Sequence, residues 1–118
     1  MKPTGIPFVV YPVSQIPRAR DFYQRVFELT ETANWENHWV EFDVGAGTLA
    51  LVDEYPGRVP GAKGAVAAFE VADLEALGRH LATLGMSWSA GPFDSPLCVS
   101  ATLCDPDGNE VIVHQRKG

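Results

Sequence analysis

The chain contains only two cysteines and three histidines among its 118 residues. Cys98 and Cys104 fall in one predicted strand, where six residues span about 20 Å, too far for a disulfide between them. Their spacing also resembles no zinc site. We therefore expect two free thiols and neither a disulfide framework nor a cysteine-based metal centre.

Positive charge is scarce as well. Nine lysines and arginines against fifteen aspartates and glutamates give a formal net charge of −6, and the basic residues form no cluster. Such a chain repels nucleic acids and anionic membranes. The apolar runs are far shorter than a membrane span, and Met1-Lys2-Pro3 does not begin a signal peptide. We expect no nucleic-acid or membrane partner, and a cytoplasmic location.

The remaining composition is that of an ordinary globular protein. Hydrophobic residues make up 46% of the chain and charged residues 20%, which are usual values for a folded domain. A chain of this length buries about two-thirds of the surface that it exposes when unfolded. We expect one domain spanning residues 1–118.

Two loose internal echoes occur in the same order in both halves of the chain. A shift of 62 residues places Ala50 on Ile112, and a shift of 58 residues places residues 11–16 on residues 69–74. The echoes predict one module used twice. The junction is expected near Pro60-Gly61, which gives modules of about 1–58 and 62–118.

Hydrophobic periodicity predicts the element order βαβββ in each module, and therefore an α+β fold. One helix is expected to begin near Ser14 to Pro17 and to run to Phe27, and the other to run from an Asp73 N-cap to Gly85. A loop is expected at 91–96. The strands are expected at 8–11, 31–35, 38–44, 48–52, 65–71, 86–89, 97–104 and 110–114.

Alternation within the strands separates a face that packs on the helices from an opposite face. The opposite face combines apolar residues with a few polar groups, which is typical of a concave pocket for a small molecule. A dimer interface on the same face is the alternative. The candidate ligand-binding residues are Phe8, Val10, Trp39, Glu41, Ala50, Val52, Val66, Ala68, Glu70, Cys98, Ser100, Ile112 and His114.

Four stretches resemble, in the correct order, segments of the vicinal oxygen chelate superfamily. They are residues 13–23 (VSQIPRARDFY), 39–42 (WVEF), 69–74 (FEVADL) and 105–109 (DPDGN). This superfamily includes glyoxalase I, the bleomycin-resistance proteins and the extradiol dioxygenases. The resemblance implies two modules that form a curved mixed sheet with helices on its convex face. It also implies a homodimer that closes the cavity across a two-fold axis.

Enzymes of this superfamily hold a divalent metal at four positions, which the resemblance places at Phe8, Ala50, Val66 and Ile112. None of these side chains offers a donor atom to a metal. The departure implies a small-molecule binding protein without a metal or cofactor, similar to the bleomycin-resistance branch. Trp39, Phe8 and Trp35 would stack on a flat ligand, and Glu41 with Glu70 would favour a cationic one.

Other interpretations of these residues stay open. The chain could be a metal-dependent lyase, isomerase or dioxygenase that uses Glu41, Glu70 and His114 as non-standard ligands, or a structural subunit without a ligand. His114 could bind a ligand, act as a general base, or stand in water at the end of its strand. Trp88 is expected to pack in the core.

Overall fold

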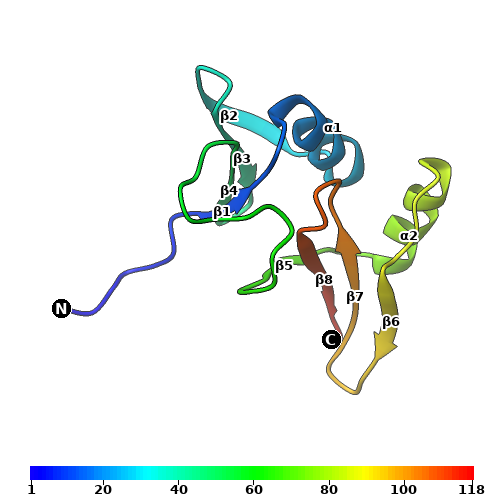
Figure 1. Ribbon diagram of the computed structural model, residues 1–118. Coiled ribbons are helices and arrows are strands. Elements are labelled where there is room, and N and C mark those ends of the chain that lie inside the picture. The colour runs from blue at the N-terminus through cyan, green and yellow to red at the C-terminus, as the bar shows by residue number, and fades with distance from the viewer. The chain divides into compact units, whose positions relative to one another are not determined.

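The computed structural model describes residues 1–118, which form two compact units, Met1–Ala62 (unit 1) and Lys63–Gly118 (unit 2) (Figure 1). No helix in the structure is long and apolar enough to cross a membrane.

Unit 1 contains one helix and a four-stranded mixed sheet. Its strands lie in the order β1-β4-β3-β2, with β1 parallel to β4 and the other neighbours antiparallel. Its elements are β1 (Val9–Pro12), α1 (Ile16–Phe27), β2 (Thr30–Trp35), β3 (Trp39–Val44) and β4 (Gly47–Val52).

Unit 2 repeats this arrangement. Its strand order is β5-β8-β7-β6, again with only the first pair parallel. Its elements are β5 (Ala67–Glu70), α2 (Leu74–Thr83), β6 (Ala90–Asp94), β7 (Cys98–Cys104) and β8 (Glu110–Arg116). The predicted α+β class and the βαβββ order of both modules are therefore confirmed.

The ladder registers of the two sheets correspond position by position. Ala50 pairs with Val10 on one side and with Glu41 on the other, and Ile112 pairs in the same way with Ala68 and Thr102. The matched positions are Val10 with Ala68, Ala50 with Ile112, Glu41 with Thr102, and Trp39 with Ser100. The repeat inferred from the sequence is thus a repeat of strand register, and equivalent residues occupy the same face of their sheets.

The helices begin and end where local signals place them. Pro17 lies in the first turn of α1, and Glu28, at φ 55°, ends this helix and donates its N–H to the Gln24 carbonyl. The Asp73 carboxylate caps α2 by accepting the N–H of Ala76 at 3.0 Å, and Gly85 follows the helix at φ 71°. A side-chain cap at the start of a helix and a glycine with positive φ after its end are common ways in which helices begin and end.

The predicted strand at 86–89 is wrong, and so is the predicted loop at 91–96. The edge strand β6 lies instead at Ala90–Asp94, with a register shift between Ala90 and Phe93. Met86 closes the end of α2, since its N–H bonds to the Leu81 carbonyl. Pro92 is tolerated in β6 because an edge strand has one side without a ladder partner. The ends of β1, β5 and β8 also differ from the expected ones, by at most two residues.

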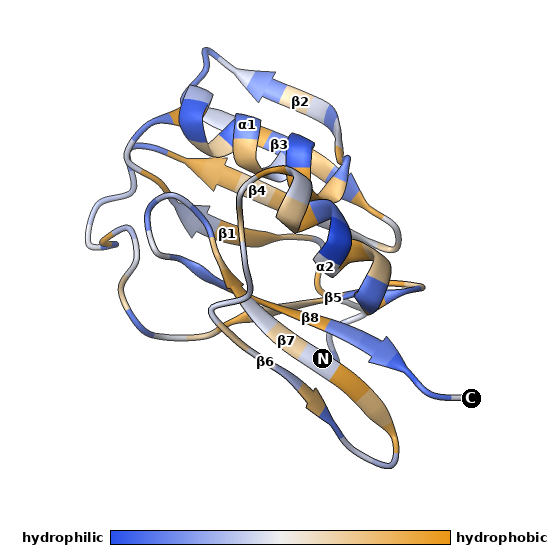
Figure 2. Cartoon of the chain, turned by 90° about the vertical axis from the view of Figure 1, so that its right-hand side faces the viewer, coloured by the Kyte–Doolittle hydropathy of each residue, from blue (hydrophilic) through white to orange (hydrophobic).

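The core of unit 1 lies between α1 and one face of its sheet. The apolar stripe of the helix is buried, with Tyr23 fully enclosed, and Val40, Phe42, Leu49 and Leu51 are at most 1% exposed. Hydropathy colouring shows the apolar run along β4 (Figure 2). Unit 2 has a corresponding core that includes Leu74, Leu81, Leu103, Val111 and Val113. Along β3 and β8 the buried positions alternate with half-buried ones, whereas in β4 the expected opposite-face residues Ala50 and Val52 are buried as well.

The turn before β8 is held by two buried polar residues. One carboxylate oxygen of Asp105 accepts the N–H groups of Asp107 and Asn109, both at 2.9 Å, and the other accepts the Asn109 side-chain amide. Gly108 lies at φ 84°, a conformation that glycine adopts without strain. This network sets the start of β8 and with it the register of the strand.

Candidate functional site

Each sheet has a face turned away from the buried core of its unit, which we call its helix-free face. On unit 1 this face carries the alternate residues of β1, β3 and β4, because their neighbours Val40, Phe42, Leu49 and Leu51 are buried in the core. The predicted residues on it are Phe8, Val10, Trp39, Glu41, Ala50 and Val52.

Two aromatic rings and a carboxylate form a cluster on the helix-free face of unit 1. The rings of Phe8 and Trp39 meet edge to face, with centroids 5.7 Å apart and planes at 87°. The Trp39 indole N–H donates to Glu41 Oε2 at 2.8 Å. This bond fixes the indole and leaves the other Glu41 oxygen for a cation or a donor group of a ligand.

The exposed part of this face is aromatic and acidic. Phe8 is 43% exposed, and Trp35, which pairs with Trp39 across the β2–β3 ladder, is 61% exposed. By contrast, Ala50 is fully buried and Val52 nearly so. The surface that unit 1 presents to a ligand on this face therefore comes mainly from the rings and from Glu41.

The helix-free face of unit 2 carries a row of residues from four neighbouring strands. Ladder pairing aligns Glu70 with His114, His114 with Ser100, and Ser100 with Phe93. A second row joins Ala68, Ile112 and Thr102. Phe93 was missed in the sequence because the glycine and prolines around it indicated a loop. The signal in the sequence that could have placed Phe93 in a strand was its aromatic side chain, which favours strands and lies between small residues.

Glu70 and His114 are in direct contact. His114 Nδ1 lies 2.5 Å from Glu70 Oε1, and the backbone N–H of Arg116 donates to Glu70 Oε2 at 2.8 Å. These two hydrogen bonds, the one from Arg116 first, lower the pKa of Glu70. The carboxylate is therefore ionised at neutral pH.

Two of the predicted residues are less clearly placed on this face. Val66 precedes β5 and is 39% exposed, so no ladder pair fixes its direction. Cys98 is half-buried at the start of β7, and its sulfur lies 3.4 Å from Ser95 Oγ. Both cysteines are free.

The donor set does not fit the metal of the superfamily's enzymes. Phe8, Ala50, Val66 and Ile112 carry only hydrocarbon side chains, and a divalent ion needs oxygen, nitrogen or sulfur donors. Nor do three histidine, cysteine, aspartate or glutamate side chains gather within either unit. Glu70 and His114 make a pair, while Glu41 belongs to unit 1 and bonds Trp39.

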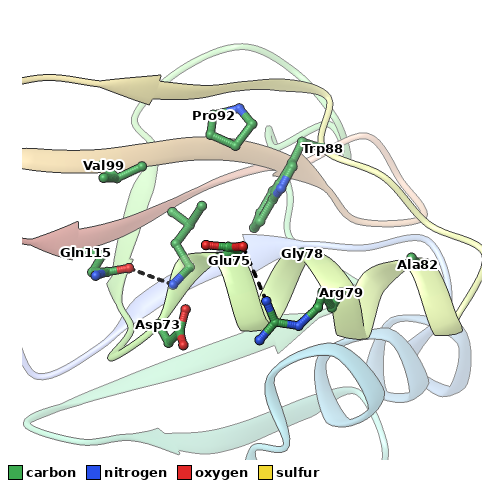
Figure 3. Close-up of a pocket in the computed structure, with 10 residues that line it drawn as sticks. Asp73, Glu75, Gly78, Arg79, Ala82, Trp88, Pro92, Val99 and Gln115 are labelled. Carbon is green, nitrogen blue, oxygen red and sulfur yellow. Dashed lines mark hydrogen bonds and ion pairs between the residues drawn. The ribbon is translucent and has the colours of Figure 1, made fainter.

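A cavity of about 620 Å³ lies on the other side of unit 2, between α2 and the strands β6 to β8 (Figure 3). Trp88, expected in the core, is half-buried and lines this cavity. At one end the Leu74 N–H donates to Gln115 Oε1 at 2.8 Å. At Gly78 a Cβ would stand 3.2 Å from the Trp88 indole nitrogen. A side chain at residue 78 would therefore press on the indole, and the ring would have to shift to make room for it.

Gly78→Val is expected to lower the free energy of unfolding by about 1–3 kcal/mol, since the branched side chain displaces the Trp88 ring. Urea denaturation followed by circular dichroism measures the change. Ala82→Val is the control, because it places the same residue at an exposed position of the same helix and costs only about 0.5 kcal/mol of helix propensity. Equal losses in the two variants would show that Gly78 does not seat the indole.

The fold and the repeat of strand register in the two units define the class of protein, together with the four metal-ligand positions that carry hydrocarbon side chains here. The chain belongs to the Glyoxalase/Bleomycin resistance protein/Dioxygenase superfamily, whose family model matches residues 5–113.

Solved structures give the nearer likenesses. TnmS3, an antibiotic binding protein from Streptomyces sp. CB03234, is 27% identical over 99% of both chains, with a TM-score of 0.83. A glyoxalase/bleomycin resistance protein from the same organism is 26% identical over 94% of this chain and 100% of that one, with a TM-score of 0.80. A lactoylglutathione lyase from Agrobacterium tumefaciens, at 22% identity over 98% and 96% of the chains and a TM-score of 0.77, shares the fold. No curated protein sequence matches the chain.

Proposed function

We propose that the protein binds a flat aromatic small molecule, without a metal, through the helix-free face of unit 1. The observation that carries the proposal is the cluster of Phe8, Trp39 and Glu41. Its indole is held in place by the bond to Glu41, and Phe8 supports it edge to face. A preorganised aromatic surface loses little conformational freedom when a ring stacks on it.

The likeness to an antibiotic binding protein over the full length of both chains supports a binding role. The hydrocarbon side chains at the four metal-ligand positions of the family support a role that needs no metal. Glu41 supports a preference for cations, because its carboxylate stands beside the stacking surface and the chain carries a net charge of −6.

Two matched probes test this function. The planar cation 9-aminoacridine and acridine, which is neutral at pH 7.5, have the same ring system. We expect both to bind, and 9-aminoacridine to bind more tightly by about 3- to 10-fold because of Glu41. Fluorescence titration measures both affinities. Glu41→Gln should remove the preference for the cation and preserve the binding of acridine.

Metal independence is tested with the same titration. The affinity for 9-aminoacridine should be equal before and after dialysis against EDTA. Metal analysis of protein purified without chelators should give far less than one ion per chain. Stoichiometric zinc, nickel, iron or manganese that restores an affinity lost on dialysis would contradict the proposal.

We also propose that the chain forms a homodimer. Large apolar side chains are exposed on both units, among them Val59 at 68% and Leu97 at 79%, and exposed apolar surface often marks an interface. Light scattering at micromolar concentration should give twice the mass of one chain. A monomer at that concentration would contradict the proposal.

A further inference from the structure

The row of Glu70, His114, Ser100 and Phe93 on unit 2 has a polar end and an apolar end. Glu70 and His114 lie on the adjacent parallel strands β5 and β8, and Phe93 lies on the edge strand β6. Phe93 is 59% exposed. The His114 side chain is 33% exposed and makes its one hydrogen bond through Nδ1.

The contacts of Glu70 determine which nitrogen of His114 carries the proton. Both carboxylate oxygens are engaged, one by the Arg116 N–H and the other by His114 Nδ1. An ionised carboxylate only accepts hydrogen bonds, so the hydrogen between the two groups belongs to Nδ1. In the neutral ring Nε2 then has a free lone pair and is an acceptor.

The surroundings of this acceptor favour an aromatic ligand. Ser100 lies beside His114 on β7, and Phe93 lies beside Ser100 on β6. Paired side chains on neighbouring strands have Cβ atoms about 4.5–5.5 Å apart. His114 and Phe93 are two strands apart, so the distance between them is about the length of one substituted benzene ring. A ring against Phe93 can thus direct a substituent toward His114.

We propose that the helix-free face of unit 2 recognises aromatic molecules that carry a hydroxyl group, and that His114 Nε2 accepts the hydrogen bond of that hydroxyl. Glu70 is a positioning residue, which fixes the tautomer and the direction of the imidazole. The inference rests on the proposed function, since it assumes a small aromatic ligand, but it concerns other residues and another chemical group of that ligand.

The test uses 4-hydroxybenzamide and 4-methoxybenzamide, which are both neutral. The methoxy compound carries a methyl group in place of the hydroxyl hydrogen, so it cannot donate the hydrogen bond that His114 would accept. Titrations of the full chain followed by NMR give both dissociation constants. We expect 4-hydroxybenzamide to bind about 3- to 10-fold more tightly, the range that one hydrogen bond supplies. His114→Phe should abolish this preference, while Phe93→Ala should weaken both compounds equally.

Glu70→Gln tests the positioning role, with the tautomer of His114 as the readout. A residue with a merely structural role would not change this tautomer. The oxygen of the substituted amide is expected to keep the Arg116 N–H, so that its NH₂ group faces His114 Nδ1 and moves the ring proton to Nε2. Nitrogen chemical shifts of the imidazole report this change of tautomer. The preference for the hydroxyl compound should disappear when the tautomer changes. The thermal midpoint of the variant should show that the protein is still folded.

The outcomes separate the two proposals. Equal affinity of the wild-type chain for both benzamides overturns the His114 inference and leaves the acridine result intact. A preference that survives in His114→Phe, or a wild-type ring protonated at Nε2, also overturns it. If neither benzamide binds while the acridines do, unit 2 has no aromatic site and the inference falls alone. If none of the four compounds binds, the proposed function falls as well.

Discussion

Trp39→Ala is expected to weaken the binding of 9-aminoacridine by about 5- to 150-fold, which corresponds to about 1–3 kcal/mol. The substitution removes the indole on which the ligand stacks and also the donor that holds Glu41. Acridine should lose nearly as much, because most of the loss is stacking. Fluorescence titration of the two probes measures the effect.

The fold should survive this substitution. The neighbours Val40 and Phe42, which point into the core of unit 1, are unchanged and fully buried. Trp88→Phe is the matched control, because Trp88 belongs to unit 2 and lines the cavity beside α2. It should leave both acridine affinities unchanged. If Trp39→Ala unfolds the chain, or if it binds the acridines as the wild type does, the aromatic cluster is not the binding surface.

Phe42→Ala is expected to lower the free energy of unfolding by about 3–5 kcal/mol. Phe42 has no exposed surface and pairs with Leu49 in the centre of the sheet of unit 1. Its removal leaves a cavity beneath α1 that the rigid strand pair cannot fill. Urea denaturation gives the value, and a large fall in the thermal midpoint should accompany it.

Glu41→Ala is the control for this loss, because it changes the adjacent residue, which points to the opposite face. It breaks one part-buried hydrogen bond to Trp39 and should cost less than about 1 kcal/mol. Comparable losses at positions 41 and 42 would mean that both faces of β3 are equally packed. That result would contradict the division of the sheet into a core face and a helix-free face.

Position 88 shows how far propensity alone can be trusted. The sequence predicted a short strand at 86–89. In the structure those residues end α2 and carry Trp88 to Gly78, while the strand forms at Ala90–Asp94. Pairing with β7 decided the outcome, and an edge strand needs only one such partner.

The sequence by itself determined the elements whose signals are local. The stripe of α1, the Asp73 cap of α2 and the alternation along β3 each depend on side chains a few residues apart, so their periodicity is visible in the chain. Duplication could be read as well, because both modules repeat the same local pattern at nearly constant spacing.

Tertiary structure alone decided which polar groups meet. Glu70 and His114 are 44 residues apart, and they touch because β5 pairs with β8 in one register. Phe93 joins their row through the pairing of β6 with β7, and Phe8 reaches Trp39 although it precedes β1. A shift of one residue in any ladder would turn these side chains to the other face. Register depends on the packing of whole strands, and that information is spread over the entire unit rather than contained in any one segment.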